Sequence, residues 1–299
     1  MKNFKKTSSW LLISLSAIML SASCSKDEND GKSGDKNTIR KSLQAKWISD
    51  ISSTTYASFE FTGDGYYFIY ENGITPRSSA EPSPQRSPFG NIAAEGNMPI
   101  LFTHLYLPES DIKPLHFGTY KEKGEQIILS ELGTIDIVSV TDEEFEFVFI
   151  PESGGESEIY ATTKAEELIP SSSRTDMLCK TWMYDHTTII ESEVPENIKE
   201  EFLEISGRNW KSELEKDADR EMKGSYINYS RTGFFTVILK KENTTQRFEW
   251  EWANAKETEI YVSEMYERNK EVDEITELSN SKLAVKELGF VVMHFVRAK

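Results

Sequence analysis

The sequence has few cysteines and histidines, and it lacks long hydrophobic runs and blocks of basic residues. Of its 299 residues, 2 are cysteine and 4 are histidine. The histidines do not have the spacing of metal ligands on a helix face, and no cysteine or carboxylate frames them. They are His104, His116, His186 and His294. We therefore predict neither a metal site nor a cofactor.

Positive charge is scarce and scattered. Lys and Arg number 34 against 50 Asp and Glu, which gives a net charge of −16. Nucleic-acid binding and docking on an anionic membrane surface both need clustered Lys and Arg side chains. The composition argues against both, and 28% charged residues is typical of a soluble protein with a polar surface.

The N-terminus has the three parts of a secretory signal. Lys2, Lys5 and Lys6 precede an apolar run at residues 10–20, and the small residues 21–23 follow it. The run is too short to cross a bilayer as a helix, and no later run approaches the length needed. We predict that residues 1–23 are a signal peptide.

Cys24 directly follows this signal and begins the segment CSKDEND. The arrangement resembles bacterial lipoprotein signals, in which the cysteine is lipidated and becomes the mature first residue. Ser21 departs from the pattern, since the family usually has a large aliphatic residue there. The acidic cluster resembles the surface-export tag of some Gram-negative lipoproteins. The resemblance implies a lipid anchor in the outer membrane at Cys24, with the protein facing outside; the alternative is an ordinary cleavage site.

The residues behind Cys24 predict a tether. Residues 25–36 contain no aliphatic or aromatic side chain, so we predict that residues 24–36 form a flexible linker between lipid and fold. Once Cys24 is acylated, Cys179 has no partner for an intrachain disulfide. Its apolar neighbours favour a buried structural thiol over a nucleophile.

Three ordered matches indicate an internal duplication. Residues 43–50 and 178–185 both read Leu-x-x-x-Trp-x-x-Asp. Residues 61–67 match 229–235, with Gly65 against Gly233, and residues 137–147 match 275–285. The matches predict two tandem copies, at residues 37–168 and 169–299. A proline-rich stretch at 76–90 extends the first copy, and about thirty extra residues extend the second.

Apolar residues alternate with polar ones through most of each copy. Short segments of this kind, joined by brief polar breaks, predict about eight strands per copy in an antiparallel meander. A short helix is expected to open each copy, at residues 38–47 and 173–182. Residues 195–224 predict a helical insertion in the second copy, which Gly207 divides. The predicted fold class is mainly β, with two antiparallel meander β-barrels.

The order of these motifs resembles the small lipocalin-like domains of bacterial lipoproteins. In that family a tryptophan closes the barrel end just after a short helix, and Trp47 and Trp182 match its position. The resemblance implies that these two residues are structural. A barrel of about eight strands is either filled by its own side chains or holds one small ligand, and the sequence leaves this choice open.

Aromatic residues are the strongest sign of a binding site. The candidate ligand-binding residues share one strand face in each copy: Tyr66, Phe68 and Tyr70 in the first, and Phe248, Trp250 and Trp252 in the second. Tyr67 points away from the first set, and Glu249 and Glu251 occupy the face opposite the second set. The alternative is that these rings fill the barrel cores.

No pattern singles out a catalytic group. His186 follows Asp185, but no Gly-x-Ser-x-Gly nucleophile elbow accompanies them. Carboxylates are abundant, yet sequence alone selects no pair for glycoside hydrolysis. We therefore predict a non-enzymatic envelope lipoprotein that binds a small ligand, a glycan or an envelope protein. The alternatives are a hydrolase of external glycans or esters and a structural component with filled barrels. The oligomeric state is left open.

Overall fold

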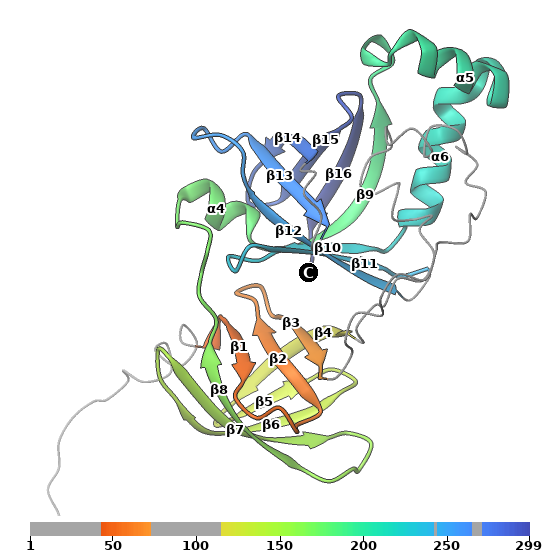
Figure 1. Ribbon diagram of the computed structural model, residues 1–299. Coiled ribbons are helices and arrows are strands. Elements are labelled where there is room, and N and C mark those ends of the chain that lie inside the picture. Colours follow the sequence, from red (N-terminus) through yellow and green to blue (C-terminus); the bar gives the residue numbers. More distant parts are fainter. Residues whose placement is uncertain (1–42, 73–114, 242–243, 265–270) are drawn as a thin grey trace, which may run out of the picture.

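The computed structural model describes residues 43–72, 115–241, 244–264 and 271–299, which form two closed β-barrels (Figure 1). Each barrel has eight antiparallel strands, as the sequence predicts. The strands of the first barrel are β1 (Lys46–Ser49), β2 (Tyr56–Phe61), β3 (Tyr66–Glu71), β4 (Leu115–Lys123), β5 (Gln126–Leu129), β6 (Gly133–Val140), β7 (Glu144–Pro151) and β8 (Glu158–Lys164). Each pairs with the next, and β8 closes the barrel against β1.

The second barrel repeats this order. Its strands are β9 (Thr181–Ile189), β10 (Tyr226–Tyr229), β11 (Phe234–Leu239), β12 (Thr244–Trp252), β13 (Glu259–Glu264), β14 (Glu271–Leu278), β15 (Lys282–Glu287) and β16 (Val291–Arg297). Here β9 takes the place of β1 and closes the barrel between β16 and β10. Two separate meanders therefore follow one another along the chain.

The alternating pattern decides which side chains enter the barrels. In β7, Phe145, Phe147 and Phe149 are at most 2% exposed, whereas Glu144 and Glu146 between them are exposed. Successive side chains of a strand point to opposite faces, so one face of β7 is wholly aromatic and turns inward. Large aromatic side chains supply much of the core of each barrel.

The duplicated motifs adopt the same geometry in both copies. Gly65 and Gly233 have φ values of 88° and 79°, a left-handed conformation that glycine adopts without a Cβ clash. Each ends a tight turn between two strands, and its carbonyl accepts a backbone hydrogen bond from the strand beyond, from Tyr120 and Trp250 respectively. The aligned hairpins β6–β7 and β14–β15 both carry a register shift, after Ile137 in one and Ile275 in the other.

The short helix before the second barrel is α4 (Ser173–Leu178). The side chain of Ser172 caps it by accepting a hydrogen bond from the Thr175 amide. The helix is shorter than predicted, because Trp182 already lies in β9. In the first copy Trp47 likewise lies in β1; Leu43 is helical, and the rest of the predicted helix falls outside the described residues.

The helical insertion between β9 and β10 is present and is divided at Gly207. After the short helix η1 (Glu191–Glu193), α5 (Glu196–Ser206) ends where Gly207 takes a φ of 67°. The turn η2 (Gly207–Asn209) leads into α6 (Trp210–Met222). A small apolar cluster that includes Phe202 and Trp210 packs the insertion against the second barrel.

Helix α6 lies beside β9 and covers part of its edge (Figure 1). Strand β10 pairs with β9 only through Met183, so the amides of later β9 residues need other acceptors on that side. Asp219 accepts from the Thr187 amide at 2.9 Å and from the Tyr184 hydroxyl at 2.6 Å. Glu215, one helical turn earlier, accepts from the Ile189 amide at 2.9 Å. The insertion therefore completes the hydrogen bonding of a strand edge.

Candidate functional site

The aromatic face of β3 lies between the two barrels. Tyr66, Phe68 and Tyr70 are 4%, 1% and 6% exposed, and they pack with side chains of β4, β9, β10 and β11. The Phe117 ring of β4 lies 5.5 Å from the Tyr66 ring and 5.1 Å from the Tyr226 ring of the second barrel. These three predicted ligand-binding residues are covered by protein and join the barrels.

Polar contacts fix this interface. The Asp64 carboxylate of the first barrel accepts from the Thr181 amide of the second at 2.9 Å. The Tyr70 hydroxyl lies 3.1 Å from the Thr236 hydroxyl. The guanidinium carbon of Arg247 in the second barrel lies 4.9 Å from the centre of the Tyr70 ring in the first. The Lys46 ammonium of the first barrel lies 4.5 Å from the centre of the Phe234 ring in the second. Cation–π contacts therefore add to the apolar packing across the interface.

The interior of each barrel is occupied by side chains. In the first, the Phe59, Phe147 and Tyr160 rings have mutual centroid distances of 4.9–5.1 Å and are 0% exposed. In the second, the predicted ligand residues Phe248 and Trp250 are 2% and 3% exposed and belong to the core. In both barrels these rings fill space that a ligand inside the barrel would need.

Trp47 and Trp182, which the resemblance implies are structural, lie at equivalent positions near the start of β1 and β9. Both are 0% exposed, and each indole donates its N–H to the carbonyl four residues earlier, at 3.1 Å on Leu43 and 2.9 Å on Leu178. Cys179 packs partly against the second core, and burial raises the pKa of its thiol far above the usual range. Such a thiol is a poor nucleophile. Cys24 lies outside the described residues.

Trp252 is the one predicted ligand-binding residue that is only partly buried, and it borders a groove of about 650 Å³. One wall is the outer face of β11, β12 and β13; the other is the linker at residues 168–170 with the loop at 253–257. Its polar and aromatic lining includes Phe234, Glu249, Glu251, Trp252, Tyr261 and Ser263. We call this the linker groove.

Strand register places the groove residues beside one another. Glu249 of β12 is paired with Phe234 on one side and with Ser263 on the other. Glu251, two residues further along the same face, is paired with Tyr261. Directly paired residues on one sheet face have Cβ atoms about 4.5–5.5 Å apart, so each carboxylate lies next to a hydroxyl-bearing side chain of β13.

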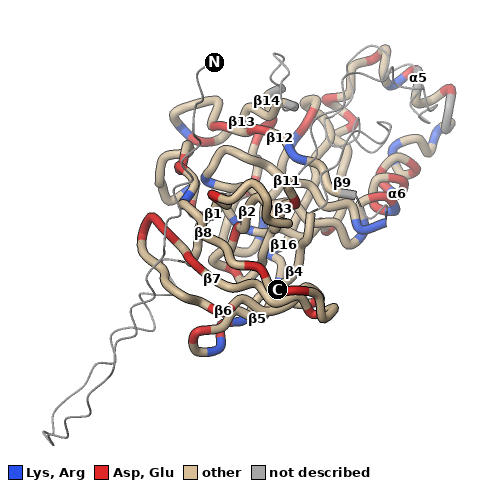
Figure 2. The backbone as a smooth tube through the Cα atoms, turned by 60° about the horizontal axis from the view of Figure 1, so that its bottom comes forward, with Lys and Arg blue, Asp and Glu red and all other residues tan. Residues whose placement is uncertain are grey.

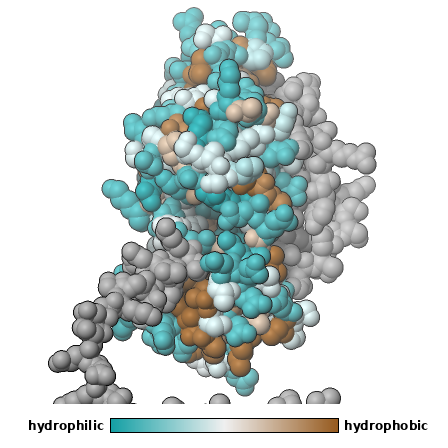
Figure 3. Space-filling view, turned by 90° about the vertical axis from the view of Figure 1, so that its left-hand side faces the viewer, coloured by the Kyte–Doolittle hydropathy of each residue, from teal (hydrophilic) through white to brown (hydrophobic). Residues whose placement is uncertain are grey.

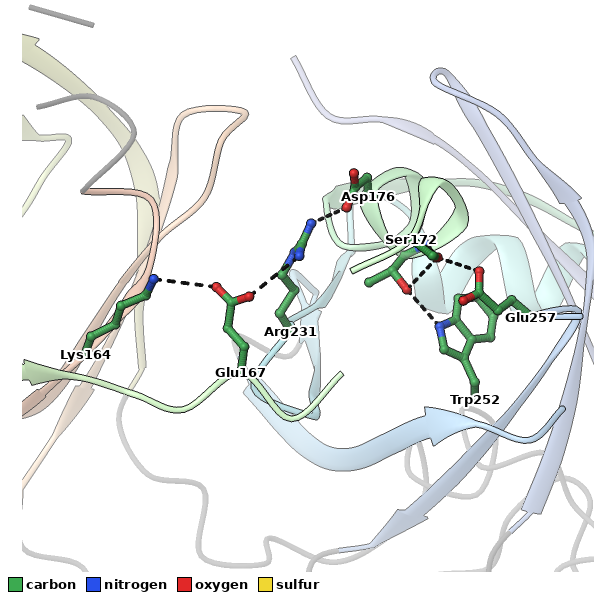
Figure 4. A network of polar contacts seen from close by, with 8 residues as sticks. Lys164, Glu167, Ser172, Asp176, Arg231, Trp252 and Glu257 are labelled. Carbon is green, nitrogen blue, oxygen red and sulfur yellow. Dashed lines mark hydrogen bonds and ion pairs between the residues drawn. The ribbon is translucent and has the colours of Figure 1, made fainter. Parts of the chain in front are cut away.

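The linker wall is held in place by a polar network (Figure 4). The carbonyl of Arg231 accepts from the Leu168 and Ile169 amides at 2.9 and 3.0 Å, and the Arg231 guanidinium contacts Glu167 and Asp176. Glu257 in the loop accepts from the Ser172 hydroxyl at 2.6 Å. The groove is therefore preformed by contacts between the linker, α4 and the loop.

The linker groove is acidic. Its lining includes Glu249, Glu251 and Glu257, and it includes neither Lys nor Arg. Elsewhere in the described chain, acidic positions are spread over both barrels and α6 (Figure 2). The groove thus disfavours anionic ligands, because bringing a second negative charge beside these carboxylates costs free energy.

Other surface features differ from the linker groove. Two further hollows, of about 300 and 440 Å³, also have polar linings, but each includes lysine as well as carboxylates. Apolar side chains are exposed on the first barrel below the more hydrophilic second barrel (Figure 3), with Ile159 70% and Val138 62% exposed. His186 and His294 stack at 4.3 Å on neighbouring strands, away from the groove lining. Within the described ranges, no group of three His, Cys, Asp or Glu residues is arranged to hold a metal ion.

Comparison with known proteins gives no relative from which to assign a function. No protein-family model and no curated protein matches the chain. None of the helices in the described residues is long and apolar enough to cross a membrane. Sequence reasoning placed Glu249 and Glu251 together on one face of a strand, but it did not find Ser263 or Tyr261, which become their neighbours only through strand pairing.

Proposed function

We propose that this protein is a non-enzymatic lipoprotein of the cell envelope that binds a small ligand or glycan in the linker groove. In this proposal, the lipid on Cys24 anchors it in the outer membrane, and residues 24–36 hold its two lipocalin-like barrels outside the cell. The signal sequence and the acidic segment behind Cys24 support the location. The filled barrels and the groove beside them support the binding site.

One observation carries the choice of site. The cores of both barrels are packed with aromatic rings, whereas the linker groove has about 650 Å³ beside Trp252 and Tyr261. Ligand pockets usually have volumes of roughly 300–1,000 Å³ and combine ring faces with a few polar groups. Aromatic faces stack on sugar rings, and carboxylates accept hydrogen bonds from sugar hydroxyls.

The binding site is tested with purified protein and a panel of oligosaccharides, using titration calorimetry. Tyr261→Ala removes a ring from the groove wall and is expected to weaken binding about tenfold, because stacking contributes about 1 kcal/mol and the ring also buries apolar area. The matched control is Tyr120→Phe, in the first barrel. The site is wrong if Tyr261→Ala binds as tightly as the wild type.

The location is tested in cells with a clickable fatty acid and with protease added outside. We expect lipid labelling in the wild type and its loss in Cys24→Ala, with release from the membrane fraction. Replacing Asp27 and Glu28 by alanine is expected to keep the lipid but remove sensitivity to external protease. Continued membrane attachment of Cys24→Ala would contradict the proposed anchor.

A hydrolase of external glycans or esters is the second candidate, favoured by the placement of Glu249 and Glu251. Two residues apart on one strand face, their Cα atoms are about 6.5–7 Å apart. Retaining glycosidases hold two carboxyl groups about 5–5.5 Å apart, and inverting ones about 6.5–9.5 Å. Release of reducing sugar by the wild type, abolished in Glu251→Gln, would replace binding by hydrolysis. A structural role with filled barrels follows if neither binding nor hydrolysis is found.

A further inference from the structure

We infer that the linker groove selects a sugar carrying a protonated amine, and that Glu249 and Ser263 receive that amine. The inference rests on the proposed binding function and adds the class of ligand. It is carried by two neighbouring acceptor groups that lack partners within the described chain, by the charge of the groove, and by an aromatic ring beside them.

The Ser263 hydroxyl is the first of these groups. Ser263 is 7% exposed, lines the groove and makes no side-chain hydrogen bond in the described part of the protein. Buried hydroxyls are nearly always hydrogen-bonded, since leaving one unpaired costs about 1–3 kcal/mol. An unpaired hydroxyl at the edge of a groove is therefore a group available to a ligand.

The Glu249 carboxylate is the second group. It is the direct cross-strand partner of Ser263 and is exposed. Neither an ion pair nor a hydrogen bond engages its side chain among the residues that the structure describes. An ammonium group has three N–H donors and no acceptor, so it can donate to the carboxylate and the hydroxyl together. A neutral hydroxyl has one donor and satisfies only one of them.

The charge around this pair favours a cation. The groove lining holds three glutamates and no basic residue. The nearest cationic groups of the interface, Lys46 and Arg247, lie against the Phe234 ring and are not among the residues that line the groove. Arg247 lies two residues before Glu249 on the same face of β12, but its guanidinium is held between the Phe234 and Tyr70 rings. The groove lining itself carries only negative side chains, which attract a positive ligand.

The Tyr261 ring favours a ligand that contains a sugar ring, because a pyranose can stack on its face. It lies two residues before Ser263 on the same face of β13 and opposite Glu251. A pyranose stacked on Tyr261 has its substituents within reach of the next pair along the strands, Glu249 and Ser263. An amine on that ring therefore meets both acceptors without a long flexible arm.

Three β-1,4-linked tetrasaccharides that differ only at carbon 2 test the inference: glucosamine, N-acetylglucosamine and glucose tetramers. At about pH 6 we expect the glucosamine tetramer to bind about fivefold more tightly than the other two. Glu249→Gln is expected to remove this preference, so that the three tetramers bind the variant with equal affinity. Glu277→Gln, an exposed carboxylate of β14 outside the groove, is the matched control and keeps the preference.

The outcomes separate the two levels of the proposal. Equal affinity for the three tetramers, reduced in Tyr261→Ala, overturns the amine inference and leaves glycan binding in the groove intact. A preference that survives in Glu249→Gln also overturns the inference, because the amine is then bound elsewhere. Failure of all three to bind overturns this inference; failure of the full oligosaccharide panel overturns the proposed glycan binding. Unchanged circular dichroism of Glu249→Gln checks that the variant is folded.

Discussion

At the scale of single residues, each barrel has one buried tryptophan that connects its first strand to the preceding segment by a hydrogen bond. The indoles of Trp47 and Trp182 are inaccessible to solvent, and each donates its N–H to a main-chain carbonyl four residues earlier. The hydrogen bond spans the point where the helical segment gives way to the first strand. Its loss removes one of the two hydrogen bonds that each carbonyl accepts, the other coming from the Ala45 or Lys180 amide, and leaves a void in the core.

Replacing Trp182 by Phe tests this role. We expect a loss of about 2–3 kcal/mol in the free energy of unfolding, from the missing hydrogen bond and the smaller ring. Trp47→Phe should behave alike. In Trp252→Phe, where the indole is only partly buried and donates to the Thr175 hydroxyl, the loss should stay below about 1 kcal/mol. Urea unfolding followed by circular dichroism measures all three; equal effects would refute the proposed role.

Ionisation of Glu158 makes the stability of the first barrel depend on pH. Burial by itself would raise the pKa of this carboxyl, but hydrogen bonds from Thr55 and Tyr160 outweigh it and lower the pKa below 4.5. Thr55 donates its hydroxyl at 2.6 Å and its amide at 3.1 Å. Because the folded state favours the ionised form, this stabilisation is present above about pH 4.5 and is lost as pH falls through the folded-state pKa.

Glu158→Gln should therefore destabilise the protein most at neutral pH. We expect a loss of up to about 1 kcal/mol at pH 7, because the site is partly exposed and screened. As the pH falls from 7 towards 3, the variant and the wild type should approach each other in stability, since the wild-type carboxyl becomes increasingly protonated. Urea titrations at both pH values measure this, with the exposed Glu156→Gln as control. A difference independent of pH would contradict the role of the charge.

At the scale of elements, the helical insertion compensates for an incomplete strand pair. Strand β9 continues beyond the residues that pair with β10. Helix α6 places Glu215 and Asp219 beside the β9 amides that have no acceptor on β10. Residues four apart on a helix rise about 6 Å, close to the 6.5–7 Å between alternate residues of a strand. The two carboxylates thus match alternate amides of β9, which explains why a helix serves there.

Asp219→Ala should open this edge. We expect a loss of about 2 kcal/mol in stability, because the Thr187 amide and the Tyr184 hydroxyl both lose their acceptor. Hydrogen exchange should rise at residues 184–190 more than elsewhere. Asp217→Ala, which removes an exposed ion pair with Arg220 on the same helix, is the control and should change stability by less than about 0.5 kcal/mol. Uniform exchange changes across the second barrel would argue against local edge protection.

At the scale of the whole molecule, the two barrels are joined by more than a linker. The interface buries the outer aromatic face of β3 against β9, β10 and β11, and polar pairs surround it. Phe68 is 1% exposed there. Burying such side chains contributes about 1.5–3 kcal/mol each, so the barrels are expected to move as one body. The linker groove lies beside this interface, and its walls belong to the linker and to the second barrel.

Phe68→Glu should separate the barrels without unfolding them, because the side chain lies outside the first barrel's core. We expect a larger radius of gyration in small-angle X-ray scattering and two thermal transitions in place of one. The far-ultraviolet circular dichroism should stay close to that of the wild type. Ile159→Glu, at a 70% exposed site on the same barrel, is the control and should change neither measurement. Unchanged scattering of Phe68→Glu would contradict the rigid interface.

Local patterns in the sequence determined the strands, the duplication, the position of the two tryptophans and the break at Gly207. These depend on periodicity, on tight turns and on backbone conformations that neighbouring residues dictate. The alternation in β3 likewise separated Tyr67 from Tyr66, Phe68 and Tyr70. Alternation distinguishes the two faces of a strand, but it carries no information about what covers each face.

Only the tertiary structure determined whether a strand face became core, interface or groove. Tyr66, Phe68 and Tyr70 lie on the face of β3 that points away from the first barrel's core. This face forms an interface because the second barrel packs on it. The linker groove brings together residues 168–170, 232–234, 249–255, 257, 261 and 263, which are separated by up to ninety-five positions in the chain. Ser263 and Glu249 meet through strand register, a long-range property that depends on the closure of the whole barrel rather than on any local segment.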